Sequence, residues 1–109
     1  MWIFTTSGFI SAVFKDGGVV VRSRDEESLM SLAVYDNASI IKTPLADYPY
    51  RLKTDQKTFA KWLELEAKQI DYTNFKSEVH QKLGYEYAHA LNQVWSVMHE
   101  VEDANARKR

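Results

Sequence analysis

Short runs of β-favouring residues, divided by glycines, open the chain. Phe9–Phe14 and Val19–Ser23 are rich in Val, Ile and Phe and flank Asp16-Gly17-Gly18, so they predict a β-hairpin. Trp2–Thr5 is expected to begin the first strand, with Ser7-Gly8 as a bend or bulge within it.

A second strand pair is predicted at Ser39–Lys42 and Tyr48–Lys53. The later segment alternates in polarity with a period of two, which predicts one buried and one exposed face. The expected buried side chains are Tyr48, Tyr50 and Leu52. Pro49 lacks a backbone N–H, so this segment is either an edge strand or begins near Pro49.

Two helices are predicted from capping residues and apolar spacing. Ser23 followed by Glu26 has the spacing of a capping box, and a helix over Glu26–Tyr35 is expected after it. Thr54 or Asp55 is expected to cap a second helix over Gln56–Ile70. Its apolar stripe at helical spacing consists of Phe59, Trp62, Leu63, Ala67 and Ile70.

The C-terminal third of the chain is predicted to be helical. Asp71-Tyr72-Thr73 forms a break in which Asp71 or Thr73 can cap a helix that starts near Asn74 and pauses at Gly84. A long final helix is expected to carry one apolar face, formed by Tyr87, Leu91, Val94, Trp95, Met98 and Val101. Residues 104–109 are polar and are expected to fray.

The order β-β-α-β-β-α-α predicts a single α+β domain over residues 1–109. We expect a two-layer sandwich, in which an antiparallel sheet of about four strands carries helices mainly on one face. The other face of such a sheet would be left open.

Composition narrows the classes of function. The 109 residues include no cysteine, which excludes thiolate zinc sites and cysteine nucleophiles and favours a reducing compartment. Met1–Phe4 lacks the basic residues of a signal peptide, and no apolar run approaches the ~20 residues that span a bilayer. We therefore expect a cytoplasmic protein without a membrane partner, metal or cofactor.

Three candidate catalytic groups have simpler structural interpretations. Glu86 and His89 have Glu-x-x-His spacing, but His89 lies opposite the apolar face of its helix, which favours exposed polar residues. Ser7 precedes a glycine and is typical of a turn. Glu66 falls inside an apolar stripe, so it is either a general acid or base in a cleft or a structural group with a partner.

Basic residues on the predicted strands are candidates for binding phosphate. Arg22 and Arg24 share one face of a strand, and Arg51 and Lys53 share one face of another. If these faces coincide, four cations line the side of the sheet away from the helices and suit a nucleic acid. No aromatic residue alternates with them along these strands, and polar residues are also the ordinary outward pattern of a sheet.

Polar and aromatic residues at element ends form the last cluster of candidates. These binding candidates are Asp47, Tyr50 and Arg51 in one segment and Tyr72, Asn74 and Lys76 in another. Turn and cap chemistry also explains these residue types: Asp47 suits an Asx turn, and Tyr72 suits packing.

Three segments carry a resemblance to known sequences: Met1–Phe4, Ala46–Arg51, and Ile70–Lys76 together with the final helix. The chain resembles, over nearly its whole length, a group of short hypothetical proteins of bacteria and their phages. That group has no assigned activity, so the resemblance implies a recurrent small domain and transfers no catalytic residue.

We therefore expect a non-enzymatic binding or regulatory module that acts through protein–protein contact, such as a phage-encoded inhibitor of a host system or a homodimer. Tyr, Trp and Arg are enriched at the centres of protein interfaces, and the chain is rich in aromatic residues. A nucleic-acid-binding module is the first alternative. An enzyme that uses Asp47, Arg51, Asn74 and Lys76 is the second.

Overall fold

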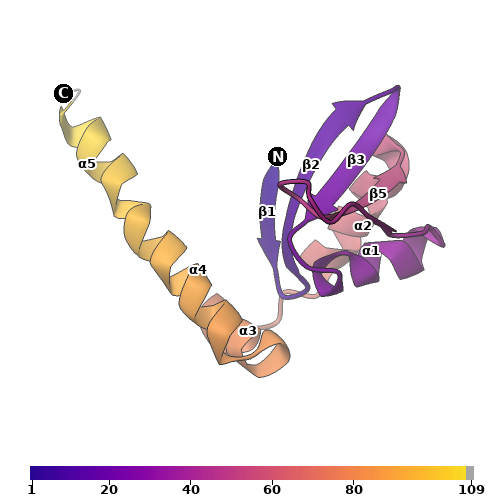
Figure 1. The fold of residues 1–109 in the computed structure, drawn as a ribbon. Coiled ribbons are helices and arrows are strands. Elements are labelled where there is room, and N and C mark those ends of the chain that lie inside the picture. The colour runs from indigo at the N-terminus through magenta and orange to yellow at the C-terminus, as the bar shows by residue number, and fades with distance from the viewer. Residues whose placement is uncertain (108–109) are drawn as a thin grey trace. The chain divides into compact units, whose positions relative to one another are not determined.

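A five-stranded antiparallel sheet forms the centre of residues 1–72 in the computed structural model, which describes residues 1–107 (Figure 1). The strands follow the order β1-β2-β3-β5-β4 across the sheet. Their bounds are β1 (Trp2–Thr5), β2 (Gly8–Lys15), β3 (Gly18–Ser23), β4 (Ile41–Lys42) and β5 (Tyr50–Thr54). The predicted α+β class is confirmed.

The sheet has five strands, one more than the four or so that were expected. Thr6 and Ser7 form a tight turn that reverses the chain, and β1 then pairs with β2 through Ile3 opposite Ile10 and Thr5 opposite Gly8. Gly8 has a φ of +138°, a conformation that glycine adopts without a steric penalty. Because Ser7-Gly8 turns the chain and does not merely bend a strand, Trp2–Thr5 becomes an edge strand of its own.

Helices α1 (Glu27–Asp36) and α2 (Gln56–Lys68) cover one face of this sheet. Alternate strand residues such as Ala12, Val21 and Leu52, which oppose one another in register, pack against Leu29 and Leu32 of α1. Phe59 and Trp62 of α2 join the same core. Each large apolar side chain that is fully buried contributes about 1.5–3 kcal/mol to folding.

The cap of α1 differs from the predicted capping box. Glu26 is itself helical and its side chain makes no capping hydrogen bond. Ser23 instead donates to the backbone carbonyl of Asp25, and Ser28 donates to the Asp25 carboxylate over 2.7 Å. Ser23 thus donates where a cap would accept, and Asp25, two residues after it, accepts from a side chain in the first turn of α1. For α2, one of the two predicted caps is correct, because Asp55 accepts from the backbone N–H of Thr58 over 2.8 Å.

A second compact unit begins at Thr73, and its described residues form three helices, namely α3 (Phe75–Leu83), α4 (Tyr85–Val97) and α5 (His99–Arg107). Asn74 caps α3 by accepting from the backbone N–H of Ser77, in place of the predicted Asp71 or Thr73. Gly84, with a φ of +96°, separates α3 from α4 at the predicted position. Val79 of α3 and Leu91 of α4 are buried.

Helices α4 and α5 follow one another along nearly the same axis (Figure 1). A single turn at Met98 divides them, with the Met98 N–H bonded to the Val94 carbonyl and the Val101 N–H to the Met98 carbonyl. Of the tail predicted to fray, residues 104–107 belong to α5, and residues 108–109 lie outside the described residues. No helix within residues 1–107 has both the length and the apolar character needed to cross a membrane.

Candidate functional site

The two pairs of basic residues predicted on separate strands meet on one face of the sheet. Arg22 of β3 lies directly opposite Arg51 of β5, and Val20 lies opposite Lys53. Residues opposite one another in an antiparallel pair point to the same side. Since Val21 and Leu52 point into the core, these cations lie on the face away from α1 and α2.

Arg24 extends this group beyond the end of β3. Its guanidinium forms an ion pair with the Asp47 carboxylate at 3.2 Å and also donates to the Asp47 carbonyl at 2.8 Å. Tyr48 presents its ring to two guanidinium groups, those of Arg22 at 4.7 Å and Arg24 at 4.8 Å. Asp47 thus faces Arg24, as an exposed pair that stabilises the fold only weakly.

Tyr48 and Tyr50 are buried and partly buried, as predicted, but only Tyr50 belongs to the strand. Tyr48 was expected to begin the buried face of a strand, but β5 begins at Tyr50, and buried Tyr48 contacts arginines. Tyr50 lies opposite Ser23, packs against the core, and has the Lys42 ammonium 5.6 Å from its ring centre. Tyr48 therefore joins the group of basic residues, whereas Tyr50 faces the core side of the sheet.

Aromatic side chains share the face that carries the cations. Trp2 lies opposite Ser11, and Ser11 lies opposite Arg22, so one row across the sheet contains Trp2, Arg22 and Arg51. On the same face Phe4 stacks on Phe9 with ring centres 4.6 Å apart, and Trp2 meets Phe9 edge-on at 5.8 Å. We call the residues Trp2, Phe4, Phe9, Arg22, Arg51 and Lys53 the open sheet face. The sequence predicted the cations of this face but not its aromatic residues, because these come from the neighbouring strands β1 and β2.

Glu66 is the acceptor of a hydrogen-bond network between elements. Its Oε1 accepts from the hydroxyl of Ser7 at 3.1 Å and from that of Ser31 at 3.2 Å. The Ser31 hydroxyl in turn accepts from the indole N–H of Trp62 at 3.0 Å. This arrangement gives Glu66 a structural role, which joins the β1–β2 turn, α1 and α2.

Tyr72 lines a cavity of about 210 Å³ beside the end of α2. The other walls include Ile3 and Phe4 of β1, Leu63 of α2 and the Glu66 carboxylate. The Glu66 carboxylate already accepts hydrogen bonds from two hydroxyl groups, so a molecule in this cavity would meet mainly apolar side chains.

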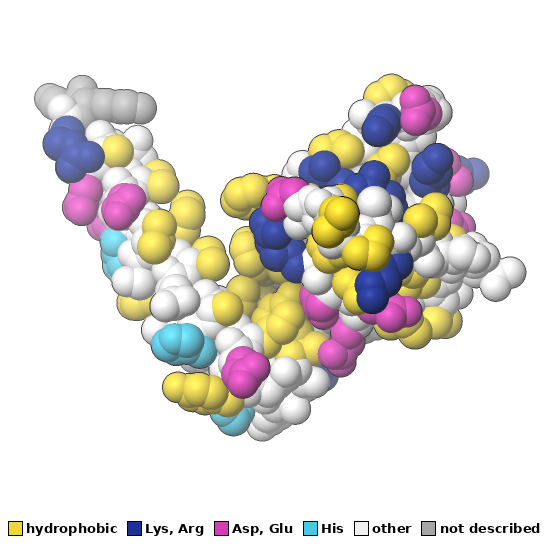
Figure 2. Space-filling model, viewed as in Figure 1, with side chains coloured by type: hydrophobic (Ala, Val, Ile, Leu, Met, Phe, Trp, Pro, Cys, Tyr) yellow, Lys and Arg dark blue, Asp and Glu magenta, His cyan; other side chains and the backbone are white. Residues whose placement is uncertain are grey.

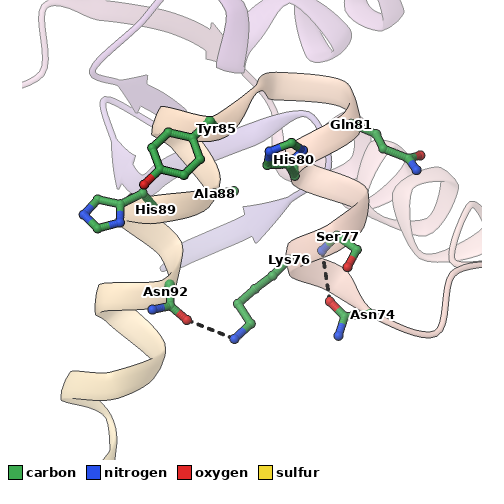
Figure 3. Close-up of a pocket in the computed structure, with 9 residues that line it drawn as sticks. All are labelled: Asn74, Lys76, Ser77, His80, Gln81, Tyr85, Ala88, His89 and Asn92. Atoms are coloured by element: carbon green, nitrogen blue, oxygen red, sulfur yellow. Dashed lines mark hydrogen bonds between the residues drawn. The ribbon is translucent and has the colours of Figure 1, made fainter.

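Asn74 and Lys76 line a second cavity, of about 550 Å³, between α3 and α4 (Figure 3). The Lys76 ammonium donates to the Asn92 side chain at 3.0 Å and lies 4.5 Å from the centre of the Trp95 ring. Figure 3 shows the Tyr85 and His89 rings side by side at the other end of the cavity, where their centres are 5.9 Å apart. The Asn74 side chain is occupied as the cap of α3.

The four residues suspected of catalysis do not all belong to one unit. Asp47 and Arg51 lie within residues 1–72, whereas Asn74 and Lys76 lie in the unit that follows. In the described part of the chain, no three His, Asp or Glu side chains are grouped so that they could hold a metal ion. His89 contacts Tyr85 instead of completing a carboxylate–histidine set with Glu86.

The second unit exposes an apolar face along α4 and α5. Figure 2 shows apolar side chains following one another along these helices. Val94, Trp95, Met98 and Val101 are between 39% and 57% exposed, while Leu91 near the α3 contact is buried. The sequence predicted one apolar face along this part of the chain, and the structure leaves four of its members exposed.

Comparison of the chain with known protein families, with curated proteins and with solved structures finds no match in any of the three. The assignment of function therefore rests on these surfaces.

Proposed function

We propose that this chain is a non-enzymatic binding module that acts through protein–protein contact along the apolar face of α4 and α5. The observation that supports the proposal is the exposure of Val94, Trp95, Met98 and Val101 on one side of two consecutive helices. Contiguous apolar patches on helices typically mark surfaces that bind another protein.

The spacing along this face is that of helices that pack lengthwise against one another. Leu91, Val94, Met98 and Val101 are separated by three, four and three residues, the repeat of helix pairs and bundles. The positions that flank this row are occupied by Ala90, Trp95 and Val97. In a two-stranded coiled coil the corresponding positions usually carry charged residues. The apolar stripe is therefore wide enough to meet more than one helix.

A second copy of the chain is the occupant that we propose for this face. In a twofold symmetric contact each copy supplies the same surface, so an apolar stripe is matched by an apolar stripe. The charged residues of α5, such as Glu100 and Asp103, lie on other sides of the helix at 100° per residue and can remain hydrated.

Light scattering coupled to size-exclusion chromatography tests this proposal. The wild-type chain is expected to elute with twice the 12.6 kDa mass of one chain and to dissociate on dilution. Met98→Glu places a charge in the centre of the contact and is expected to give the monomer.

Ser96→Glu is the matched control, because Ser96 lies on the opposite side of α4 and its replacement should leave the dimer intact. A wild-type chain that stays monomeric at high concentration contradicts the proposal. Equal effects of Ser96→Glu and Met98→Glu would also contradict it.

A further inference from the structure

We infer that the open sheet face binds single-stranded nucleic acid, with phosphates on its cations and bases on its aromatic rings. This inference concerns residues 1–72 and does not depend on the contact proposed for α4 and α5. It rests on the juxtaposition of Trp2, Phe4 and Phe9 with Arg22, Arg51 and Lys53 on one face, away from α1 and α2.

The cations of this face are not neutralised by carboxylates. Arg24, next to the face, pairs with Asp47, but among the residues described neither Arg51 nor Lys53 has an acidic partner. Arg22 donates to the neutral hydroxyl of Ser11 at 2.8 Å. The Nε atoms of Arg22 and Arg51 are buried and have no hydrogen-bond acceptor within the described chain, so a phosphate would contact the terminal guanidinium nitrogens. A local positive field therefore exists on a chain whose net charge is −1, and its complement is a polyanion.

The aromatic residues narrow the choice of polyanion. Trp2 is 69% exposed on an edge strand, and its ring is held edge-on against Phe9, which itself stacks on Phe4. Exposed rings on a sheet provide stacking surfaces for bases, and such stacking does not depend on sequence. Only unpaired bases present their faces, which favours a single strand over a duplex.

The spacing fits a short length of strand. Trp2, Ser11, Arg22 and Arg51 form one row across β1, β2, β3 and β5, so three strand spacings, or roughly 14 Å, separate Trp2 from Arg51. A strand that crosses this row can stack a base on Trp2 while its phosphates contact Arg22 and Arg51. Lys53 lies one side-chain position further along β5 on the same face and extends the phosphate track.

Fluorescence anisotropy of labelled oligo-dT and oligo-U, about a dozen nucleotides long, tests this inference with the full chain. Both probes are expected to bind more tightly than a duplex of equal length. If about three cations contact phosphates, affinity should fall roughly 20-fold between 50 and 200 mM salt.

Exposed positions allow variants that preserve the fold. Trp2→Ala is expected to weaken binding about tenfold or more through lost stacking. Lys53→Gln should weaken it and reduce the slope of log affinity against log salt by about 0.7. The controls are Lys57→Gln, an exposed cation of α2, and Tyr35→Ala, an exposed aromatic residue of α1; both should bind as the wild type does.

Three outcomes would overturn the inference. The first is that neither probe binds at low salt. The second is that Trp2→Ala and Lys53→Gln bind as tightly as the wild type. The third is that polyglutamate competes as well as unlabelled oligo-dT, because a surface that recognises charge alone does not distinguish them.

Discussion

Gly8 lies where the turn between β1 and β2 approaches α1. A Cβ atom at this position would be 2.1 Å from the Ser28 hydroxyl oxygen, which accepts from the Phe9 N–H and donates to Asp25. The backbone is also left-handed here, with a φ of +138°. Steric overlap and backbone strain therefore act at the same residue.

We expect Gly8→Ala to lower the free energy of unfolding by about 2–4 kcal/mol, because it combines strain with overpacking. Chemical denaturation monitored by circular dichroism measures this loss. Gly17→Ala is the matched control: its φ is +77° but no atom lies within 4 Å of the added Cβ, so only about 1 kcal/mol should be lost. Equal losses in the two variants would show that the contact with Ser28 is unimportant.

Glu66 shows how a carboxylate in an apolar stripe can be structural. We expect Glu66→Ala to destabilise the chain by about 1–3 kcal/mol, because Ser7 and Ser31 lose their common acceptor. Glu66→Gln should cost less, since its amide oxygen can still accept. Denaturation of both variants, with Glu64→Gln as an exposed control on the same helix, tests this order. A Glu66→Ala variant as stable as the wild type would contradict the network's role.

Asp55 caps the N-terminus of helix α2. The backbone N–H and then the hydroxyl of Thr58 donate to Asp55, and these hydrogen bonds hold the pKa of Asp55 below its usual value of 3.8. A group whose pKa is lower in the folded state stabilises that state above its unfolded pKa, and this stabilisation is lost as the pH falls through the folded pKa.

We therefore expect Asp55→Ala to be less stable than the wild type at neutral pH, and this difference to shrink as the pH falls below 3.8. Thermal unfolding at a series of pH values measures it. Asp71→Ala, which removes an exposed aspartate outside any helix, is the control. A difference between Asp55→Ala and the wild type that grows on acidification would contradict the argument.

The start of α1 shows why caps are harder to predict than helices. Ser23 and Glu26 have the right spacing, yet Glu26 has helical geometry and the carboxylate of Asp25 is bonded to Ser28. The Ser28 hydroxyl also accepts from the Phe9 N–H on β2, so a contact with the sheet holds Ser28 in place at the start of α1. The local spacing of residues predicted the helix, but the packing of the helix against the sheet determined which hydrogen bonds form at its start.

The buried residues are distributed unevenly between the two compact units. Every member of the main core, including Leu29, Leu52 and Trp62, lies within residues 1–72. In the described part of the second unit, Val79 and Leu91 are the buried residues, and isolated helices of this length are marginal in water.

A fragment of residues 1–72 is therefore expected to fold on its own and to unfold cooperatively on heating. Residues 73–109 alone should have low helicity when dilute, because their helices bury little surface. Circular dichroism of the two fragments checks this prediction. The absence of a cooperative transition in the fragment 1–72 would contradict it, and would show that the sheet needs the residues that follow.

Features that depend on neighbouring residues could be predicted from the sequence. The hairpin around Asp16-Gly17-Gly18, the helix after Asp55 and the pause at Gly84 follow from turn, cap and spacing patterns, because these are local interactions. The α+β class follows from their order. The separate strand Trp2–Thr5 was missed, since its pairing depends on a reversal that the pattern shows only as a bend.

The candidate surfaces needed the tertiary structure. Strand register determined that Arg22 faces Arg51 and that Trp2 lies in the same row, and no spacing along the chain encodes a register between distant strands. The packing of α1 and α2 against the sheet likewise brought the partners of Glu66 within hydrogen-bond distance. The sequence by itself determined most of the helices and strands and which of their faces are apolar. Only the fold decided which residues meet, because contacts between distant segments depend on how these elements pack.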